Sequence, residues 1–158
     1  MRALLAIALL IGLLWPVNAL ADITGKPRVI DGDTLEIAGE RIRLHGIDAP
    51  EAGQTCRADG IEYRCGQQAA LALADKIGQQ AVSCQPKDQD RYGRIIAVCW
   101  LGAEDLGAWM VSEGWALAYR KYSTDYVLHE GAARQGRRGL WRGEFQAPWE
   151  WRSARRNQ

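Results

Sequence analysis

The sequence predicts an α+β fold in which a small five-stranded β-barrel is accompanied by three helices. Polar and apolar side chains alternate from Arg41 to Ile47, which indicates a strand with one buried face. Ala, Leu and Ile recur at helical spacing over Gln67–Ile77. Along the chain, three strand patterns precede a helix, two more strands follow, and helices come last. This order is typical of the α+β class.

Turn residues separate the predicted strands. Gly32 interrupts the first two strands and Gly39 marks the next turn, because glycine adopts backbone angles that other residues avoid. Asp90–Arg94 forms the turn between the last two. The predicted strands are Arg28–Ile30, Thr34–Ile37, Arg41–Ile47, Ala81–Gln85 and Ile95–Leu101, with Trp115–Tyr119 as a further strand or an extended segment. Short strands with such breaks fit a closed barrel of the oligonucleotide/oligosaccharide-binding (OB) type.

Three segments are predicted to be helical. The first is Gln67–Ile77, the second is the short amphipathic stretch Leu106–Glu113, which Gly114 ends, and the third is Tyr126–Gln135. From about residue 143 we expect an irregular tail rich in Trp and Arg. Trp149 and Trp151 are expected to fasten this tail to the body.

The first 21 residues have the layout of a cleaved signal peptide. Arg2 is the only charge there, an apolar run of 13 residues covers Ala3–Trp15, and Ala19–Ala21 fits a cleavage point. The alternative, a membrane anchor, would need about 20 apolar residues. Residues 22–158 then form one domain, which we expect to be a secreted or periplasmic monomer with no membrane attachment.

Acidic and basic residues balance at 19 each beyond Arg2, which argues against a generally basic surface for nucleic-acid binding. A local basic site remains possible. The arginines of the C-terminal part are expected to lie on a solvated surface rather than in a groove: Arg134, Arg137, Arg138, Arg142, Arg152, Arg155 and Arg156.

Four cysteines in an exported chain predict two disulfides. Three pairings are possible, and we favour Cys56–Cys65, which closes a short loop, with Cys84–Cys99, which straddles a hairpin. A zinc site is the alternative, but the chain has no C-x-x-C spacing and few His residues.

Acidic side chains concentrate between residues 29 and 51. Asp31-Gly32-Asp33 alone is more often a simple turn, but a meander over residues 34–47 would bring Asp33 and Asp48 to one end of the sheet. Neighbouring carboxylates repel unless a cation lies between them, and oxygen ligands suit Ca²⁺ or Mg²⁺. Glu51 could then orient or deprotonate a water molecule.

Two arginines lie near these acids in the predicted fold. Arg43 is on the strand that leads to Asp48, and Arg94 follows the Asp90–Arg94 turn. A guanidinium group can donate two parallel N–H hydrogen bonds to two oxygens of one phosphate. The combination predicts hydrolysis of a phosphate diester. Tyr92, Tyr119 and Tyr122 could stack on bases or simply pack.

The strings VIDGDT, RLHGIDAPE, DRYGR, DLGAWMVSEGWALAY and RRGLW resemble the thermonuclease (staphylococcal nuclease-like) family over about residues 27–142. The resemblance implies a five-stranded OB barrel with three helices. It also implies Ca²⁺-dependent cleavage of DNA and RNA that leaves 3′-phosphate ends.

The resemblance also implies roles for single residues. Asp33, Asp48 and the backbone carbonyl of Ala49 match the calcium ligands, Asp31 matches a nearby acid that acts through water, and Glu51 matches the general base. Arg43 and Arg94 match the phosphate-binding arginines, Arg91 and Tyr92 match a pair near the terminal phosphate, and Tyr119 matches a tyrosine of the nucleotide pocket. A second pocket tyrosine aligns with Lys121, and Tyr122 is one place away.

Two other functions use the same predicted barrel. A module that binds nucleic acid without catalysis would have lost the acids, whereas this chain keeps them. A polysaccharide-binding module would not respond to a nucleoside bisphosphate.

Overall fold

The computed structural model describes residues 21–157. The predicted signal peptide therefore lies outside the described residues, apart from Ala21. Within the described part, no helix combines the length and the apolar character needed to cross a membrane.

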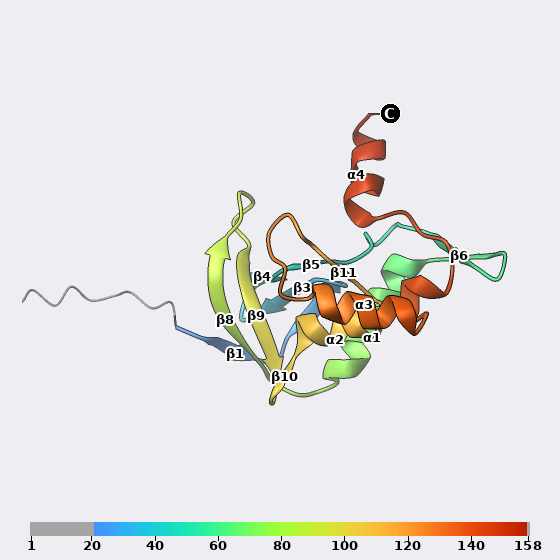
Figure 1. Cartoon of the computed structure of the whole chain (residues 1–158). Helices are drawn as coiled ribbons and strands as arrows, with labels where there is room; N and C mark the ends of the chain where they lie inside the picture. The colour runs from blue at the N-terminus through green and yellow to red at the C-terminus, as the bar shows by residue number, and fades with distance from the viewer. Residues whose placement is uncertain (1–20, 158) are drawn as a thin grey trace, which may run out of the picture.

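The described residues form a mixed α+β structure around one main sheet (Figure 1). Its strands, given in the order in which they pair, are β1 (Ile23–Gly25), β8 (Val82–Gln89), β9 (Ile95–Leu101), β4 (Glu40–Leu44), β3 (Thr34–Ile37) and β2 (Arg28–Asp31), and β10 (Glu104–Asp105) also pairs with β9. All of these pairs are antiparallel except β4 with β9, which is parallel. The predicted strands are confirmed here apart from Arg41–Ile47, and β1 and β10 were not predicted.

The predicted strand Arg41–Ile47 is divided in two by a turn. The strand β4 ends at Leu44, Gly46 takes a positive φ of 69°, and β5 (Ile47–Asp48) then pairs with β11 (Leu117–Ala118) in a separate small sheet. The segment Trp115–Tyr119 is thus a strand only at its centre, and it does not join the main sheet. A third small sheet pairs β6 (Cys56–Ala58) with β7 (Ile61–Tyr63).

Four α-helices accompany the sheets. They are α1 (Cys65–Ile77), α2 (Leu106–Ser112), α3 (Val127–Gln135) and α4 (Pro148–Arg156), and a 3₁₀-helix, η1 (Gly139–Arg142), follows α3. The first three match the predicted helices to within two residues. The prediction of an irregular tail is wrong, because α4 occupies most of it. Figure 1 shows α4 projecting from the body at the C-terminal end of the chain.

A single large apolar core joins the main sheet to α1 and α2. Leu35 and Ile42 of the sheet, Leu73 of α1 and Met110 of α2 are fully buried in it. Fully burying one such side chain contributes about 1.5–3 kcal/mol. The core therefore fixes how the strand ends that carry the acids meet.

Both favoured disulfides are present: Cys56–Cys65 and Cys84–Cys99. The second joins directly paired residues of β8 and β9. The first joins Cys56 of β6 to Cys65, the first residue of α1. It thereby closes a loop in the segment that follows Glu51.

Candidate functional site

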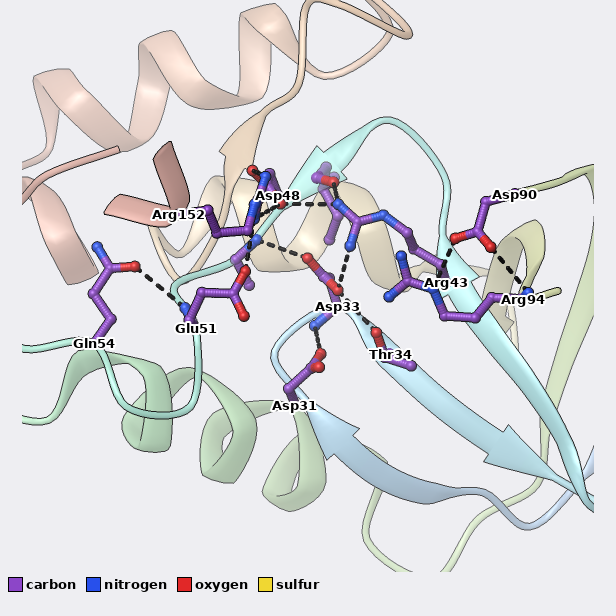
Figure 2. Close-up of polar contacts among 12 residues, drawn as sticks. Asp31, Asp33, Thr34, Arg43, Asp48, Glu51, Gln54, Asp90, Arg94 and Arg152 are labelled. Carbon is purple, nitrogen blue, oxygen red and sulfur yellow. Dashed lines mark hydrogen bonds and ion pairs between the residues drawn. The ribbon is translucent and has the colours of Figure 1, made fainter. Parts of the chain in front are cut away.

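The centre of the site is an arginine that joins two buried acids. Thr34 of β3 pairs with Arg43 of β4, so Asp33, just before β3, lies beside the Arg43 side chain. Arg43 Nη1 donates to Asp33 Oδ1 at 2.9 Å, and Arg43 Nη2 donates to Asp48 Oδ1 at 2.9 Å (Figure 2). The predicted meander thus brings Asp33 and Asp48 to one place, as expected.

Other donors hold the Asp33 carboxylate. Its Oδ1 also accepts from the Thr34 hydroxyl at 3.0 Å, and its Oδ2 accepts from the Ala49 backbone N–H at 2.9 Å. Asp33 is only 4% exposed and Asp48 is 0% exposed. Both acids are therefore fixed in position, and Ala49 contacts the cluster through its main chain.

Asp31 lies next to this cluster and carries an electrostatic cost. Its Oδ1 accepts from the backbone N–H of Asp33 at 3.0 Å. Burial, and then repulsion by Asp33, raise the pKa of Asp31 from 3.8 to about 6. A positive charge added here would relieve that repulsion.

Burial and neighbouring charges also shift the Asp48 and Arg43 groups. Burial, with a smaller contribution from Asp33, raises the pKa of Asp48, although nearby guanidinium groups oppose the shift. Burial alone would lower the pKa of Arg43, but Asp33 and Asp48 together raise it above its usual value. The two acids therefore favour the charged form of Arg43.

Glu51 is held by its backbone, while its side chain remains partly exposed. Its N–H donates to Gln54 Oε1 at 3.2 Å, and its carbonyl accepts from the Gln54 N–H at 2.8 Å. Gly66 of α1 approaches closely, since a Cβ at Gly66 would lie 1.7 Å from the Glu51 carbonyl oxygen. Gln54 and Gly66 therefore position Glu51, and neither residue was predicted.

Arg152 of α4 enters the same cluster, so the prediction that the C-terminal arginines all lie on a solvated surface is wrong for this residue. Arg152 Nη1 donates to Asp48 Oδ1 at 3.1 Å and to Glu51 Oε1 at 2.7 Å, and Nη2 donates to Asp48 Oδ2 at 2.8 Å. Figure 2 shows Arg152 between the two acids. Burial alone would lower the pKa of Arg152, but its hydrogen bonds to Asp48 and Glu51 raise it.

A partial signal for α4 was present in the sequence. Pro148 at the start of a helix is favoured, and Trp149 and Arg152, three residues apart, share a helix face. Nothing local indicated that this face would meet Asp48, 104 residues away.

The Asp90–Arg94 turn between β8 and β9 forms a separate group. Asp90 accepts from the backbone of Tyr92 and Arg94, and its Oδ2 accepts from Arg94 Nε at 2.8 Å. Arg91 and Arg94 both lie over the Tyr92 ring, which is 71% exposed. In Figure 2 the Arg94 guanidinium end points toward the side of the cluster occupied by Arg43. Among residues 21–157, however, its side chain bonds only Asp90.

Tyr119 lies on the α4 side of the site. Its ring stacks parallel to that of Trp149, with centroids 5.3 Å apart, and meets Tyr122 edge-on at 4.9 Å. The Tyr119 backbone N–H donates to the Gly46 carbonyl at 2.8 Å, and the preceding strand β11 pairs with β5, which carries Asp48. The Tyr119 side chain itself contacts α4 through Trp149.

The donor set fits a hard divalent cation such as Ca²⁺. Asp33 and Asp48 are close enough for one arginine to bond both. Burial, and then repulsion by Asp33, raise the pKa of Asp31, and a bound cation would offset that repulsion. Among residues 21–157 no group of three or more His, Cys, Asp or Glu forms a ready-made metal cage. Main-chain and solvent oxygens would thus have to complete a coordination sphere of 6–8 ligands.

Comparison with known proteins relates the chain to nucleases. The family model described as staphylococcal nuclease homologue matches residues 41–143. The chain is 37% identical to micrococcal nuclease of Shigella flexneri over 99% of this chain and 96% of that protein. It is also 37% identical to an uncharacterized endonuclease of Escherichia coli over 87% of this chain and 90% of the relative.

A third relative has a different description. The succinoglycan biosynthesis protein ExoI of Rhizobium meliloti (strain 1021) is 37% identical over 80% of this chain and 69% of its own length. The family match covers more than half of the chain and includes Arg43, Asp48, Glu51 and Arg94. The chain therefore belongs to the staphylococcal nuclease homologues and is a nuclease, an enzyme that hydrolyses phosphodiester bonds.

Proposed function

We propose that the protein is a Ca²⁺-dependent endonuclease that cleaves DNA and RNA and leaves 3′-phosphate ends. The observation that carries this proposal is the buried cluster in which Arg43 joins Asp33 to Asp48. Such a cluster places carboxylate oxygens that can bind a metal ion beside the Arg43 guanidinium, which can bind phosphate, before substrate arrives.

Asp33 and Asp48 would hold the ion with the Ala49 carbonyl, and Asp31 would act through water. When bound, Ca²⁺ supplies positive charge against which a phosphodiester can be seated and polarised. The observations that support these ligands are the burial of both acids and the main-chain contact between Ala49 and Asp33.

The catalytic roles fall to Glu51, Arg43 and Arg94. Glu51 orients or deprotonates the attacking water, a role supported by its partly exposed carboxylate beside Asp48. Arg43 and Arg94 bind the phosphate and stabilise the charge that builds up as phosphorus becomes five-coordinate.

The remaining contacts serve the ends of the nucleotide. Arg91 and Tyr92 bind near a terminal phosphate, which the exposure of the Asp90–Arg94 turn supports. Tyr119 lines the base pocket, where Lys121 or Tyr122 takes the second position.

The scaffold would be a closed five-stranded OB barrel. The two edge strands of the main sheet, β1 and β2, are consecutive in the chain and only Lys26 and Pro27 separate them. One continuous segment thus pairs with β8 at one end and with β3 at the other, which supports closure. The protein acts as an exported monomer, and its two disulfides suit an oxidising compartment.

Digestion tests this function directly. Purified residues 22–158 should degrade plasmid DNA and RNA in Ca²⁺ and leave both intact in EGTA. The DNA product ends should resist extension by a DNA polymerase until a 3′-phosphatase exposes their 3′-hydroxyl groups. Substrate that stays intact in both conditions would contradict the proposal and favour a non-catalytic binding module. A nucleoside bisphosphate that leaves the melting temperature unchanged would favour a polysaccharide-binding module.

A further inference from the structure

The helix α4 lies beyond residues 41–143, the part of the chain that matches the family. It nevertheless places Arg152 against the acids of the site. We propose that Arg152 is a further substrate-binding residue, which adds a third guanidinium group to those of Arg43 and Arg94 and contacts the phosphodiester. This inference rests on the proposed function.

The position of Arg152 gives the first argument. Its two terminal nitrogens lie 2.8–3.1 Å from the Asp48 oxygens, and Nη1 lies 2.7 Å from Glu51. Any phosphate that comes close enough to Asp48 and Glu51 to react also comes within reach of Arg152. The planar guanidinium can present two donors to two phosphate oxygens at once.

Exposure gives the second argument. Arg43 and Arg152 both bond Asp48, but the Arg152 side chain is 29% exposed, against 16% for Arg43. Arg152 therefore lies nearer to the solvent from which a polynucleotide must arrive. Both guanidinium groups bond the buried Asp48. The second partner of Arg152 is Glu51, whose side chain is 37% exposed, whereas that of Arg43 is Asp33, at 6%. Arg152 can therefore exchange an acid for a phosphate at lower cost than Arg43.

The third argument is that α4 is anchored independently of Arg152. Gln54 Nε2 donates to the Gln146 carbonyl at 2.7 Å just before the helix, and Trp149 stacks on Tyr119. The helix can thus stay in place while the Arg152 guanidinium changes partner. Because the helix is already in place, substrate binding does not have to order its backbone, which lowers the entropy cost of binding.

A cavity beside α4 offers space for the strand next to the reacting phosphate. It has a volume of about 590 Å³ and is lined by Tyr119, Lys121, Trp149, Ser153 and Arg156, among others. Ser153, the residue after Arg152, belongs to this lining. The helix that carries Arg152 thus borders both the acid cluster and a partly basic cavity.

Binding of deoxythymidine 3′,5′-bisphosphate at saturating Ca²⁺, followed by calorimetry, tests the role of Arg152. Arg152→Met removes the charge but keeps an unbranched, helix-compatible side chain. We expect it to weaken binding by at least about tenfold, the loss typical of a hydrogen bond to a charged group, and to raise KM for an oligonucleotide. Arg155→Met is the matched control, since Arg155 is exposed on the same helix and packs over Trp151, and it should bind as the wild type does.

Four results would overturn the inference. Unchanged affinity in Arg152→Met would make Arg152 a purely structural residue, and higher affinity would make it a cation that obstructs the site. If Arg152→Met detaches α4, which hydrogen exchange over residues 148–156 would reveal, Arg152→Lys decides. With α4 protected, reduced affinity in Arg152→Lys supports the need for a two-pronged donor, and wild-type affinity contradicts it.

A wild-type protein that neither binds the bisphosphate nor cleaves overturns the proposed function as well. If the wild type does both, a negative result concerns only the role of Arg152.

Discussion

The two predicted phosphate-binding arginines lie in contrasting surroundings. Arg43 is largely buried and bonds two acids from other parts of the chain, whereas Arg94 bonds only an acid four residues away within its own turn, as far as residues 21–157 describe. In the first arrangement function and stability depend on the same residues, because removal of one charge leaves the others buried without that partner. The second ties function to a local turn, so we expect a substitution there to affect stability less.

The contrast is sharpest for substitution of Arg43 itself. Arg43→Met leaves two buried carboxylates without their shared partner, so we expect a loss of about 3–5 kcal/mol in the free energy of unfolding, measured by urea denaturation in EDTA. Arg41→Met, on the exposed face of the same strand, is the control and should change stability little. Equal stabilities for Arg43→Met and Arg41→Met would mean that the buried Arg43 cluster contributes no more to stability than an exposed position of the same strand.

Substitution of Asp31 should raise the free energy of unfolding rather than lower it, because the Asp31 charge destabilises the ion-free protein. Its pKa is raised to about 6 in the folded state from 3.8, so the penalty is absent below pH 4 and complete above pH 6. Asp31→Asn keeps the acceptor for the Asp33 N–H, so we expect it to stabilise the EDTA-treated protein by up to about 3 kcal/mol at pH 7.5.

That gain should fade on acidification to pH 4 and shrink when Ca²⁺ is added. Thermal melts at both pH values, with and without Ca²⁺, measure it. A gain that is the same at pH 4 and pH 7.5 would show that the Asp31 charge is not its source.

The contact between α1 and the loop that carries Glu51 should be sensitive to one methyl group. Gly66→Ala would place a Cβ 1.7 Å from the Glu51 carbonyl, so the loop must shift. We expect a loss of about 1–3 kcal/mol in the free energy of unfolding and a large fall in kcat. Gly53→Ala, in open space on the same loop, serves as the control. Wild-type kcat in Gly66→Ala would mean that the position of Glu51 does not matter.

The smallest effect on stability is expected in the exposed turn. Arg94→Lys keeps the charge beside Asp90 but loses the two-pronged guanidinium. The pair is local, with side chains 25% and 16% exposed, and because the charge is kept we expect a loss of at most about 1 kcal/mol. Turnover should nevertheless fall by about 10²–10³, as for loss of one donor to the transition state. Steady-state kinetics together with denaturation separate these quantities, and near-normal turnover would exclude Arg94 from catalysis.

Local patterns were enough to predict the inner cluster. Alternation over Arg41–Ile47 and the turn at Gly32 placed Asp33, Arg43 and Asp48 at neighbouring strand ends, and β3–β4 pairing brings them together. The Cys84–Cys99 bridge was predictable for the same reason, because its two ends flank one hairpin.

Contacts between distant segments could not be predicted in this way. Arg152 reaches Asp48 only because Gln54 and Trp149 dock α4 against the body. Those contacts depend on tertiary packing that leaves no periodic pattern in the sequence. The helix itself was not predicted, although Pro148 is a favoured first residue of a helix.

The central claim is that Asp33 and Asp48 together bind one divalent cation. Calorimetric titration of Ca²⁺ into EDTA-treated, exhaustively dialysed protein tests it most directly. We predict a single saturable site in the wild type and its loss in the Asp33→Asn/Asp48→Asn variant, with the fold checked by circular dichroism. A folded double variant that binds Ca²⁺ as the wild type does would contradict the account.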